Sequence, residues 1–284
     1  MASYLRPSDL GEALQALAEK KRAIIAGGTD YYPARVGRPL DDDVLDITAL
    51  PELRAITDQG DHIRVPALAT WTDLIEARLP PHFAALKLAA REVGGVQIQN
   101  AGTLCGNLCN ASPAADGVPP LLALDASVEL ASHAGRRVLP LADFVLGNRR
   151  TALAADELMT AILVPRPAGP TRSTFLKLGA RKYLVISIVM VAVAITETPD
   201  HRIAAARVAI GACSAAAQRL AELEAALAGR PIDARLGDLV DLTHLAPLSP
   251  IDDIRATAAY RRDAALTLIA RALASFAAPA GAAP

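Results

Sequence analysis

One stretch of small residues in the middle of the chain, residues 99–116, constrains the fold more than any other segment. It reads QNAGTLCGNLCNASPAAD and lies between two helical patterns. It is too polar and too rich in small residues for a core segment, so we expect a loop that contacts a ligand. Small residues let backbone N–H groups approach a ligand closely, and successive amides in a turn form a concavity that binds anions. Side-chain donors and acceptors recur along it at Thr103, Asn107, Ser112 and Asp116.

A second stretch of the same kind lies upstream, at residues 24–31, with the sequence IIAGGTDY. It overlaps a short apolar segment, residues 22–26, that is predicted to be a strand. A strand followed by a glycine-rich turn is the context of many phosphate-binding loops. An ordinary strand-to-helix turn is the alternative interpretation of this stretch. Two such loops in one domain predict a ligand with a pyrophosphate in its middle.

Composition narrows the class of protein. At 284 residues the chain is long enough for two domains, and 52% hydrophobic against 21% charged residues predicts a packed core. A net charge of −1 without a basic block argues against a nucleic-acid partner. Three cysteines and no apolar signal-peptide region predict a cytoplasmic protein. The longest apolar run, residues 185–195, is about half as long as the roughly 20 residues of a membrane-spanning helix, so a buried strand is predicted there.

Turn residues and hydrophobic periodicity predict the elements before residue 166. Ser8 is the predicted N-cap of a helix that continues to about Lys20. Thr70 and Asp73 have the spacing of a capping box at the start of another helix. Further helices are predicted at 82–93 and 121–124, strands at 44–47 and 158–164, and hairpins that pair 53–57 with 62–66 and 127–132 with 136–139.

Residues 166–171, with the sequence RPAGPT, are predicted to separate two domains because prolines and glycine favour turns. Strands are predicted beyond this point at 175–178, 186–196 and 203–212. Helices are predicted after them at 215–228, 236–243 and 257–275. Strands grouped before helices indicate an α+β domain with an antiparallel sheet. The tail, residues 277–284, is not expected to pack.

At these residues the chain resembles the FAD-binding medium subunits of the molybdenum hydroxylases. That family includes the flavin subunits of xanthine dehydrogenases, aerobic carbon monoxide dehydrogenases, aldehyde oxidoreductases and 4-hydroxybenzoyl-CoA reductase. The sequence AGGTD at 26–30 is similar to the family's first pyrophosphate loop. TLCGN at 103–107 followed by ASPAAD at 111–116 is similar to the second, and DDIRATAAYRR at 252–262 is similar to a segment near the family's C-terminus. The order and spacing of the three segments, within residues 4–273, make the resemblance specific.

The resemblance implies an α+β fold with two domains. Residues 1–170 would form the two-lobed FAD-binding domain of the vanillyl-alcohol oxidase (PCMH) type. Residues 171–276 would form a C-terminal domain of the CO dehydrogenase flavoprotein kind, with a three-stranded antiparallel sheet and helices. Residues 277–284 would be a disordered tail.

The resemblance also implies which residues hold FAD, without a covalent bond. Both loops would close on the diphosphate and the ribityl chain. Asp116 would accept hydrogen bonds from FAD hydroxyls, cap the helix that follows it, or do both. Lys177 would be a cation near the flavin or a solvated strand lysine, and Leu158 and Met159 would contact the flavin or belong to the core. The complete predicted set is Ile24, Ile25, Ala26, Gly27, Gly28, Thr29, Asp30, Tyr31, Thr103, Leu104, Cys105, Gly106, Asn107, Asp116, Leu158, Met159 and Lys177.

Some positions depart from the family pattern. Cys105 replaces the commoner glycine, which predicts a side chain beside the diphosphate. Cys105 and Cys109 are too few for a zinc or iron–sulfur site, which takes four ligands, so no metal is predicted on this chain. Val93 would leave one face of the flavin open, and Leu184 occupies a position where some relatives carry an acid. The five histidines are scattered and are predicted to be surface or turn residues, and no catalytic residue is assigned.

The resemblance implies an oxidoreductase subunit that carries FAD and transfers electrons. Its partners would be a large molybdopterin subunit and a small subunit with [2Fe–2S] clusters, in a dimer of heterotrimers. Electrons would pass from the clusters through FAD to NAD+, a quinone or another acceptor. A stand-alone FAD-dependent oxidoreductase of the same fold is one alternative. A structural subunit with a degenerate flavin site is another, and Cys105 is the feature that raises it.

Overall fold

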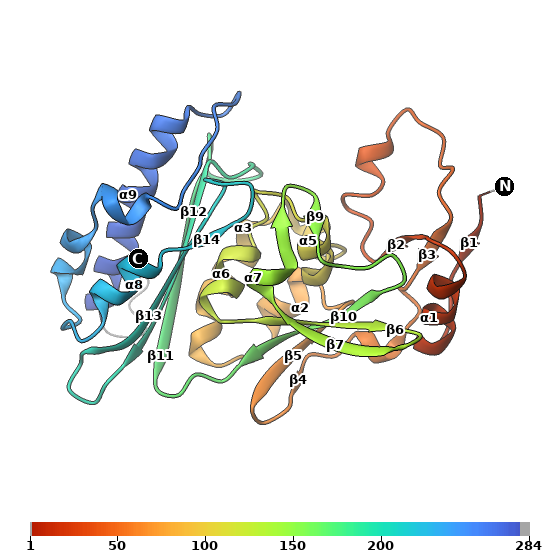
Figure 1. Ribbon diagram of the computed structural model, residues 1–284, viewed down its shortest axis with the longest axis horizontal. Helices are drawn as coiled ribbons and strands as arrows, with labels where there is room; N and C mark the ends of the chain where they lie inside the picture. Colours follow the sequence, from red (N-terminus) through yellow and green to blue (C-terminus); the bar gives the residue numbers. More distant parts are fainter. Residues whose placement is uncertain (1, 279–284) are drawn as a thin grey trace. The chain divides into compact units, whose positions relative to one another are not determined.

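The computed structural model describes residues 2–278, and within them the chain forms two compact units (Figure 1). The first unit comprises Met1–Ala77, Gly95–Ala111 and Asp125–Pro165. The second comprises Arg78–Gly94, Ser112–Leu124 and Arg166–Pro284. Two segments that precede residue 170 therefore belong to the second unit. The predicted limits of two consecutive domains stay a prediction.

The first unit begins with a small parallel sheet. Its strands are β1 (Tyr4–Leu5), β3 (Val44–Asp46) and β2 (Ala23–Ile25), in the order β1-β3-β2. Helix α1 (Leu10–Glu19) lies between β1 and β2 in the sequence and is capped by Asp9, whose carboxylate accepts a hydrogen bond from the Glu12 amide at 2.9 Å. The prediction that Ser8 caps this helix was wrong, because the Ser8 amide instead donates to the Glu12 side chain.

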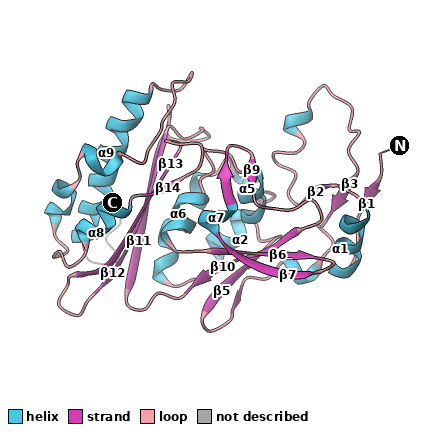
Figure 2. Cartoon of the chain, in the orientation of Figure 1, coloured by secondary structure: helices cyan, strands magenta, loops and turns pink. Residues whose placement is uncertain are grey.

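A five-stranded antiparallel sheet forms the larger part of the first unit (Figure 2). The predicted hairpin of 127–132 with 136–139 is found in it, and the Thr70–Asp73 capping box is confirmed at the start of α2 (Trp71–Glu76). The other hairpin is present, but its first strand is Thr57–Asp58 and not 53–57, because Pro51–Leu53 forms a 3₁₀ helix. The sheet has the order β4-β5-β10-β6-β7, with β4 (Thr57–Asp58), β5 (His62–Pro66), β10 (Leu158–Pro165), β6 (Ser127–Ser132) and β7 (Gly135–Pro140). The unit also contains α4 (Val96–Gln99), α5 (Leu104–Asn110), α7 (Leu141–Phe144), β8 (Val145–Gly147) and β9 (Arg150–Thr151).

The second unit is built on an antiparallel sheet, as predicted. The three predicted strands are β11 (Thr171–Leu178), β12 (Val189–Glu197) and β13 (Ile203–Gly211), and a two-residue strand, β14 (Gln218–Arg219), follows β13 in the sheet. Helices α3 (Ala84–Glu92) and α6 (Val118–Ala123) lie on one face, and α8 (Ala221–Leu227) and α9 (Ala258–Ala274) on the other (Figure 1).

Strand β12 is buried on both faces because helices cover each side of the sheet. Val191, Val193 and Ile195 belong to the apolar core that α8 and α9 complete. The intervening Ala192 and Ala194 project from the opposite side of the strand, where small side chains leave room for α3 and α6. The buried Met190 is on the same side as Ala192 and Ala194, so this second face combines one large residue with small ones.

Several predicted bounds in the second unit were too generous. The predicted helix at 215–228 is α8 alone, and the one at 236–243 is two 3₁₀ helices, Ala234–Leu239 and Leu242–Leu245. The apolar run enters the sheet only at Val189. Leu184, which precedes the run, has a left-handed backbone (φ 53°). Of the predicted tail, Ala277 ends a 3₁₀ helix, and residues 279–284 lie outside the described part of the chain. Within residues 2–278, no helix combines the length and apolar character needed to cross a membrane.

Candidate functional site

The first bend, residues 26–31, connects β2 to a 3₁₀ helix, Pro33–Arg35. Ile24 and Ile25 precede it in β2 and pair with β3. Gly28 has φ 68°, a left-handed conformation that glycine adopts without a steric cost. The Tyr32 amide donates to the Gly28 carbonyl at 3.2 Å, which turns the chain into the 3₁₀ helix.

The amides of this first bend have no partner in the described part of the chain. None of the six consecutive N–H groups of residues 26–31 donates a hydrogen bond to a described residue. Apart from the exposed Asp30, these residues are half-buried. Backbone donors are nearly always satisfied in folded proteins, and a run of such donors in a turn favours an anionic ligand. The first bend therefore has the chemistry that its sequence predicts.

The second bend, residues 101–107, differs from its prediction. Its last residues begin helix α5, and Thr103 is the N-cap, with its hydroxyl accepting from the Gly106 amide at 3.0 Å. Leu104, Cys105 and Leu108 are buried. The expectation that this stretch is a loop unsuited to the core was wrong, because its apolar residues recur at helical spacing on one buried face.

Most amides of the second bend donate within the chain. The Gly102 amide donates to Ile98 at 2.7 Å and the Leu104 amide to Ala69 at 3.2 Å. The Asn107 amide donates to the Thr103 carbonyl at 3.0 Å. Thr103 and Cys105 alone in residues 102–107 have amides without a described partner. The second bend thus offers fewer donors to a ligand than the first.

The two bends contact each other, while their predicted closure on the diphosphate stays a prediction. A Cβ atom on Gly27 would overlap the carbonyl oxygen of Ala101. A Cβ atom on Gly102 would lie 3.3 Å from the Thr29 hydroxyl oxygen. Glycine is required where two backbones approach this closely. The two segments lie about 70 residues apart in the sequence, and both belong to the first unit.

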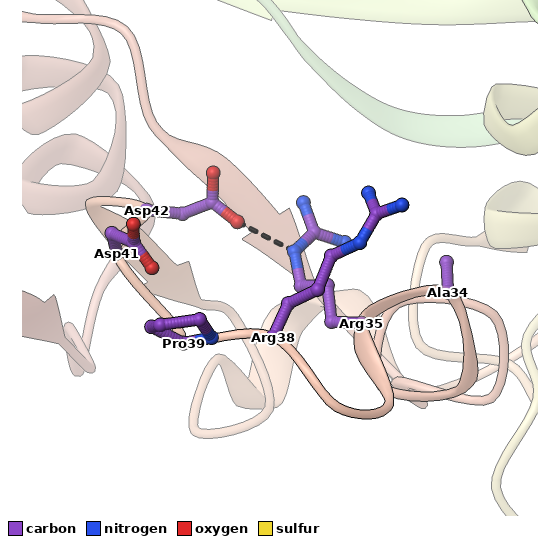
Figure 3. A pocket seen from close by; sticks show the side chains of 6 residues that line it. All are labelled: Ala34, Arg35, Arg38, Pro39, Asp41 and Asp42. Carbon is purple, nitrogen blue, oxygen red and sulfur yellow. Dashed lines mark hydrogen bonds and ion pairs between the residues drawn. The ribbon is translucent and has the colours of Figure 1, made fainter.

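A surface pocket of about 560 Å³ lies beside the segment that follows the first bend (Figure 3). Arg35 and Arg38 line it together with Asp41 and Asp42. Arg35 Nε is 2.7 Å from Asp42 Oδ2, and both arginine side chains point to the same side in Figure 3. Two carboxylates oppose two guanidinium groups, so the pocket has no net charge with which to select an anion.

The second unit contains a buried cluster centred on Asp116. Lys177 Nζ donates to Asp116 Oδ2 at 2.8 Å and to the Glu92 carbonyl at 3.2 Å. The Ser187 hydroxyl donates to Asp116 Oδ1 at 2.7 Å. Burial raises the pKa of Asp116, although the Lys177 ammonium and the Ser187 hydrogen bond act in the opposite direction.

This geometry excludes one interpretation of Asp116 and one of Lys177, and their predicted roles toward FAD stay predictions. Helix α6 is capped by Gly117 without a side-chain bond, so Asp116 is not its cap. The side chain of Lys177 is 5% exposed, so it is not a solvated strand lysine. The sequence analysis missed Ser187. A single hydroxyl that interrupts the apolar run at 185–195 was the available signal.

Three side chains that were predicted to lie against FAD, two at the flavin and one beside the diphosphate, are buried in the protein. Leu158 and Met159 of β10 are each 2% exposed. Cys105 is 3% exposed, with Sγ 4.0 Å from the Val65 carbonyl oxygen. Burial raises the pKa of the Cys105 thiol. Its side chain lies inside the first unit and does not project from the bend, and the flavin contacts of Leu158 and Met159 stay a prediction.

The segment near the C-terminus that carries the third similarity joins structural elements. Arg261 of α9 is buried, and its guanidinium donates to the carbonyls of Ile188 at 2.6 Å and Ala212 at 3.0 Å. It also donates to Asp253 Oδ1 at 2.8 Å. These bonds connect α9 to the start of β12 and the end of β13, and they fix the backbone next to Ser187.

One histidine departs from its predicted surface position. His82 is buried, and its Nε2 has no partner in the described part of the chain. Burial and the nearby Arg166 guanidinium lower its pKa. Its place before α3 explains the burial, because the Ser173 hydroxyl of β11 donates to the His82 carbonyl at 2.6 Å.

Comparison with known proteins places both parts of the chain in described families. Residues 1–167 match the model described as the FAD binding domain in molybdopterin dehydrogenase. Residues 174–276 match the CO dehydrogenase flavoprotein C-terminal domain.

Similar proteins match over nearly the whole chain. The xanthine dehydrogenase FAD-binding subunit of Escherichia coli O157:H7 is 30% identical, over 99% of this chain and 97% of that protein. The nicotine 6-hydroxylase medium subunit of Paenarthrobacter nicotinovorans is 30% identical, over 95% of each chain. A chain in the structure of Hydrogenophaga pseudoflava carbon monoxide dehydrogenase that lacks the Mo-pyranopterin moiety is 28% identical. It superposes with a TM-score of 0.85 over 97% of this chain and 96% of that one.

Proposed function

Because this chain belongs to the FAD-binding medium subunits of the molybdenum hydroxylases, we propose that it relays electrons and leaves the organic substrate to a partner. Electrons arrive from [2Fe–2S] clusters of a small subunit and leave to NAD+ or another acceptor. Bound FAD supplies the two-electron redox chemistry. The organic substrate is oxidised at a molybdopterin centre on a large subunit, and the complex is a dimer of heterotrimers.

The six unpartnered amides of the first bend are the observation that carries this proposal. They supply N–H donors for the FAD diphosphate. Residues 26–31 include no lysine or arginine, so backbone dipoles and not cationic side chains stabilise its negative charge. Gly27 approaches the Ala101 carbonyl too closely for any side chain at position 27. The residues present therefore fit an anionic dinucleotide.

The cysteine content supports the proposal that the iron–sulfur clusters are on a different subunit. A [2Fe–2S] cluster takes four ligands, and the whole chain has three cysteines. Two of them, Cys105 and Cys213, are buried as free thiols. The clusters that deliver electrons to this chain therefore belong to a partner.

Isolation of the complex from its native host through a tag on this chain tests the proposal. We expect iron, molybdenum and flavin in the purified material, and flavin absorbance at about 450 nm in the chain separated from its partners. Anaerobic NADH should bleach that absorbance if NAD+ is the acceptor. A chain without flavin would contradict the proposal that it transfers electrons through FAD. A flavin-containing chain that purifies without iron and molybdenum would favour the stand-alone oxidoreductase.

A further inference from the structure

We propose that the β8–β9 hairpin, residues 145–151, is a docking surface for the iron–sulfur subunit, and that this partner presents an apolar pocket flanked by carboxylates. This inference rests on the proposed function, which requires a separate subunit that delivers electrons. It adds the surface of this chain on which that subunit sits. No residue of the hairpin belongs to the set predicted to hold FAD.

A β-bulge turns one apolar side chain of the hairpin outward. The register of β8 with β9 shifts between Val145 and Gly147, which leaves Leu146 as the extra residue of the bulge. Val145 and Gly147 are buried, whereas Leu146 is 53% exposed. Bulges re-aim side chains and are frequent next to functional sites. An aliphatic side chain held outward on paired backbone is the kind of anchor that fills a pocket on a partner.

The turn of the hairpin contains an arginine where turn chemistry favours glycine or asparagine. Arg149 has φ 56°, in the left-handed region that side chains other than these rarely adopt. Its amide donates to the Ala111 carbonyl at 2.8 Å, and Ala111 is left-handed as well, with φ 45°. A residue kept in a strained conformation against local preference indicates that its side chain has a function.

Two arginine side chains give the hairpin a positive charge that the described chain does not neutralise. Arg149 and Arg150 are exposed, and neither pairs with a carboxylate within residues 2–278. Arg149 Nη1 donates to the backbone carbonyl of Asn110 at 3.4 Å and to the side-chain oxygen of the same residue, both uncharged groups. Two guanidinium groups beside an apolar anchor are complementary to a surface with carboxylates around an apolar pocket.

The hairpin lies close to the bends of the first unit that are assigned to FAD. Asn110 ends helix α5 and Ala111 is its C-cap, and both accept hydrogen bonds from Arg149. Thr103 of the second bend begins the same helix, whose seven residues span about 10 Å. Electron transfer slows steeply with distance, so the subunit that delivers electrons to FAD must dock near the bends. This location favours the iron–sulfur subunit over the molybdopterin subunit as the occupant.

The experiment measures the affinity of the FAD-loaded full chain for the small iron–sulfur subunit, separated from the native complex, at a series of salt concentrations. Arg149→Gly and Arg150→Ala should each weaken binding by up to about fivefold at low salt. Both should approach the wild-type affinity at high salt, because salt screens exposed charges. Leu146→Gln should weaken binding at every salt concentration, because burial of an apolar side chain is not screened.

Arg149→Gly separates docking from folding. Glycine adopts the left-handed conformation without a steric cost and keeps the amide that donates to Ala111. The variant should therefore unfold at the wild-type temperature or above it, while it binds the iron–sulfur subunit more weakly. A purely structural role of Arg149 would produce the opposite pair of results.

Arg136→Ala is the matched control. Arg136 is an exposed arginine on β7 of the same unit and lies outside the hairpin. Its variant should keep the wild-type affinity for the iron–sulfur subunit at every salt concentration.

Four results would overturn the proposal. They are a wild-type chain that does not bind the iron–sulfur subunit, wild-type affinity in all three hairpin variants, an equal loss in Arg136→Ala, or a loss confined to binding of the molybdopterin subunit. Unchanged binding with slower bleaching by NADH would also overturn it, because the arginines would then serve a nucleotide. A wild-type chain that retains no FAD would instead overturn the proposed function, so the two failures are distinguishable.

Discussion

The two bends of the first unit look alike in sequence and differ in what their backbones can bind. The first bend leaves the amides of residues 26–31 without a described partner. In the second bend most amides donate within the chain, because the segment starts helix α5 and meets Ala69 and Ile98. Richness in glycine and threonine is therefore a poor guide to free donors. The residues that follow a bend decide whether its amides are available.

The largest expected effect comes from the residue where both bends meet. Gly27→Val should lower the free energy of unfolding by about 3 kcal/mol, because its side chain displaces the Ala101 backbone. FAD should be lost from the folded fraction as well. Chemical denaturation and flavin absorbance measure the two effects. Gly11→Ala, in helix α1 of the same unit, should retain stability and FAD, and a stable, FAD-loaded Gly27→Val protein would show that the bends do not need this contact.

Gly28→Ala tests the first bend by itself. Its left-handed φ of 68° disfavours alanine by about 1 to 2 kcal/mol, and the new Cβ atom would lie 2.7 Å from the Tyr32 ring. We expect Gly28→Ala to lower the free energy of FAD binding by more than it lowers the free energy of unfolding. Titration of the apoprotein with FAD measures the first quantity, and chemical denaturation measures the second. Unchanged FAD affinity would remove the first bend from the binding site.

Thr103→Ala tests the second bend. Loss of the N-cap should cost about 1 kcal/mol of stability, while FAD content per folded molecule stays at the wild-type level because the backbone amides remain. Thermal unfolding and the flavin-to-protein ratio provide the measurements. If Thr103→Ala released FAD without loss of stability, the claim that the second bend offers FAD fewer donors than the first would be wrong.

Cys105 should have the smallest effect at neutral pH, because its contribution to the pH dependence of stability appears only in alkali. Burial raises the pKa of its thiol, so the folded state keeps the proton that the unfolded state loses above a pKa of about 8.5. Stability should therefore decline by up to about 1.4 kcal/mol per pH unit above that value. Urea unfolding across this range should show a shallower decline in Cys105→Ala. Equal slopes in the two proteins would place the thiol in water.

Local sequence signals predicted much of the fold. The Thr70–Asp73 capping box, the two hairpins and the antiparallel strands of the second unit depend on neighbouring residues, and the structure contains them. Errors occurred where a distant partner decided the outcome. The 99–116 stretch looked like a loop because its small residues were read without the buried face formed by Leu104, Cys105 and Leu108.

The residues of the candidate site also fall into those that local sequence predicts and those that depend on a distant partner. Glycine at 27 and 28 pointed to a close backbone approach from sequence alone, since only glycine tolerates it. The hydrogen bond of Ser187 could not be predicted from the sequence, because its acceptor is the Asp116 carboxylate, 71 positions earlier in the chain.

The sequence alone determined the antiparallel sheet of the second unit, the glycine bends and the family similarity, because each depends on residue type and spacing. Tertiary structure decided which amides stay free, that Cys105 points inward, and that Asp116 binds Lys177 and Ser187 and does not cap a helix. The physical reason is that a hydrogen bond depends on where its partner is placed. That placement is set by the folded chain and not by the residues beside it.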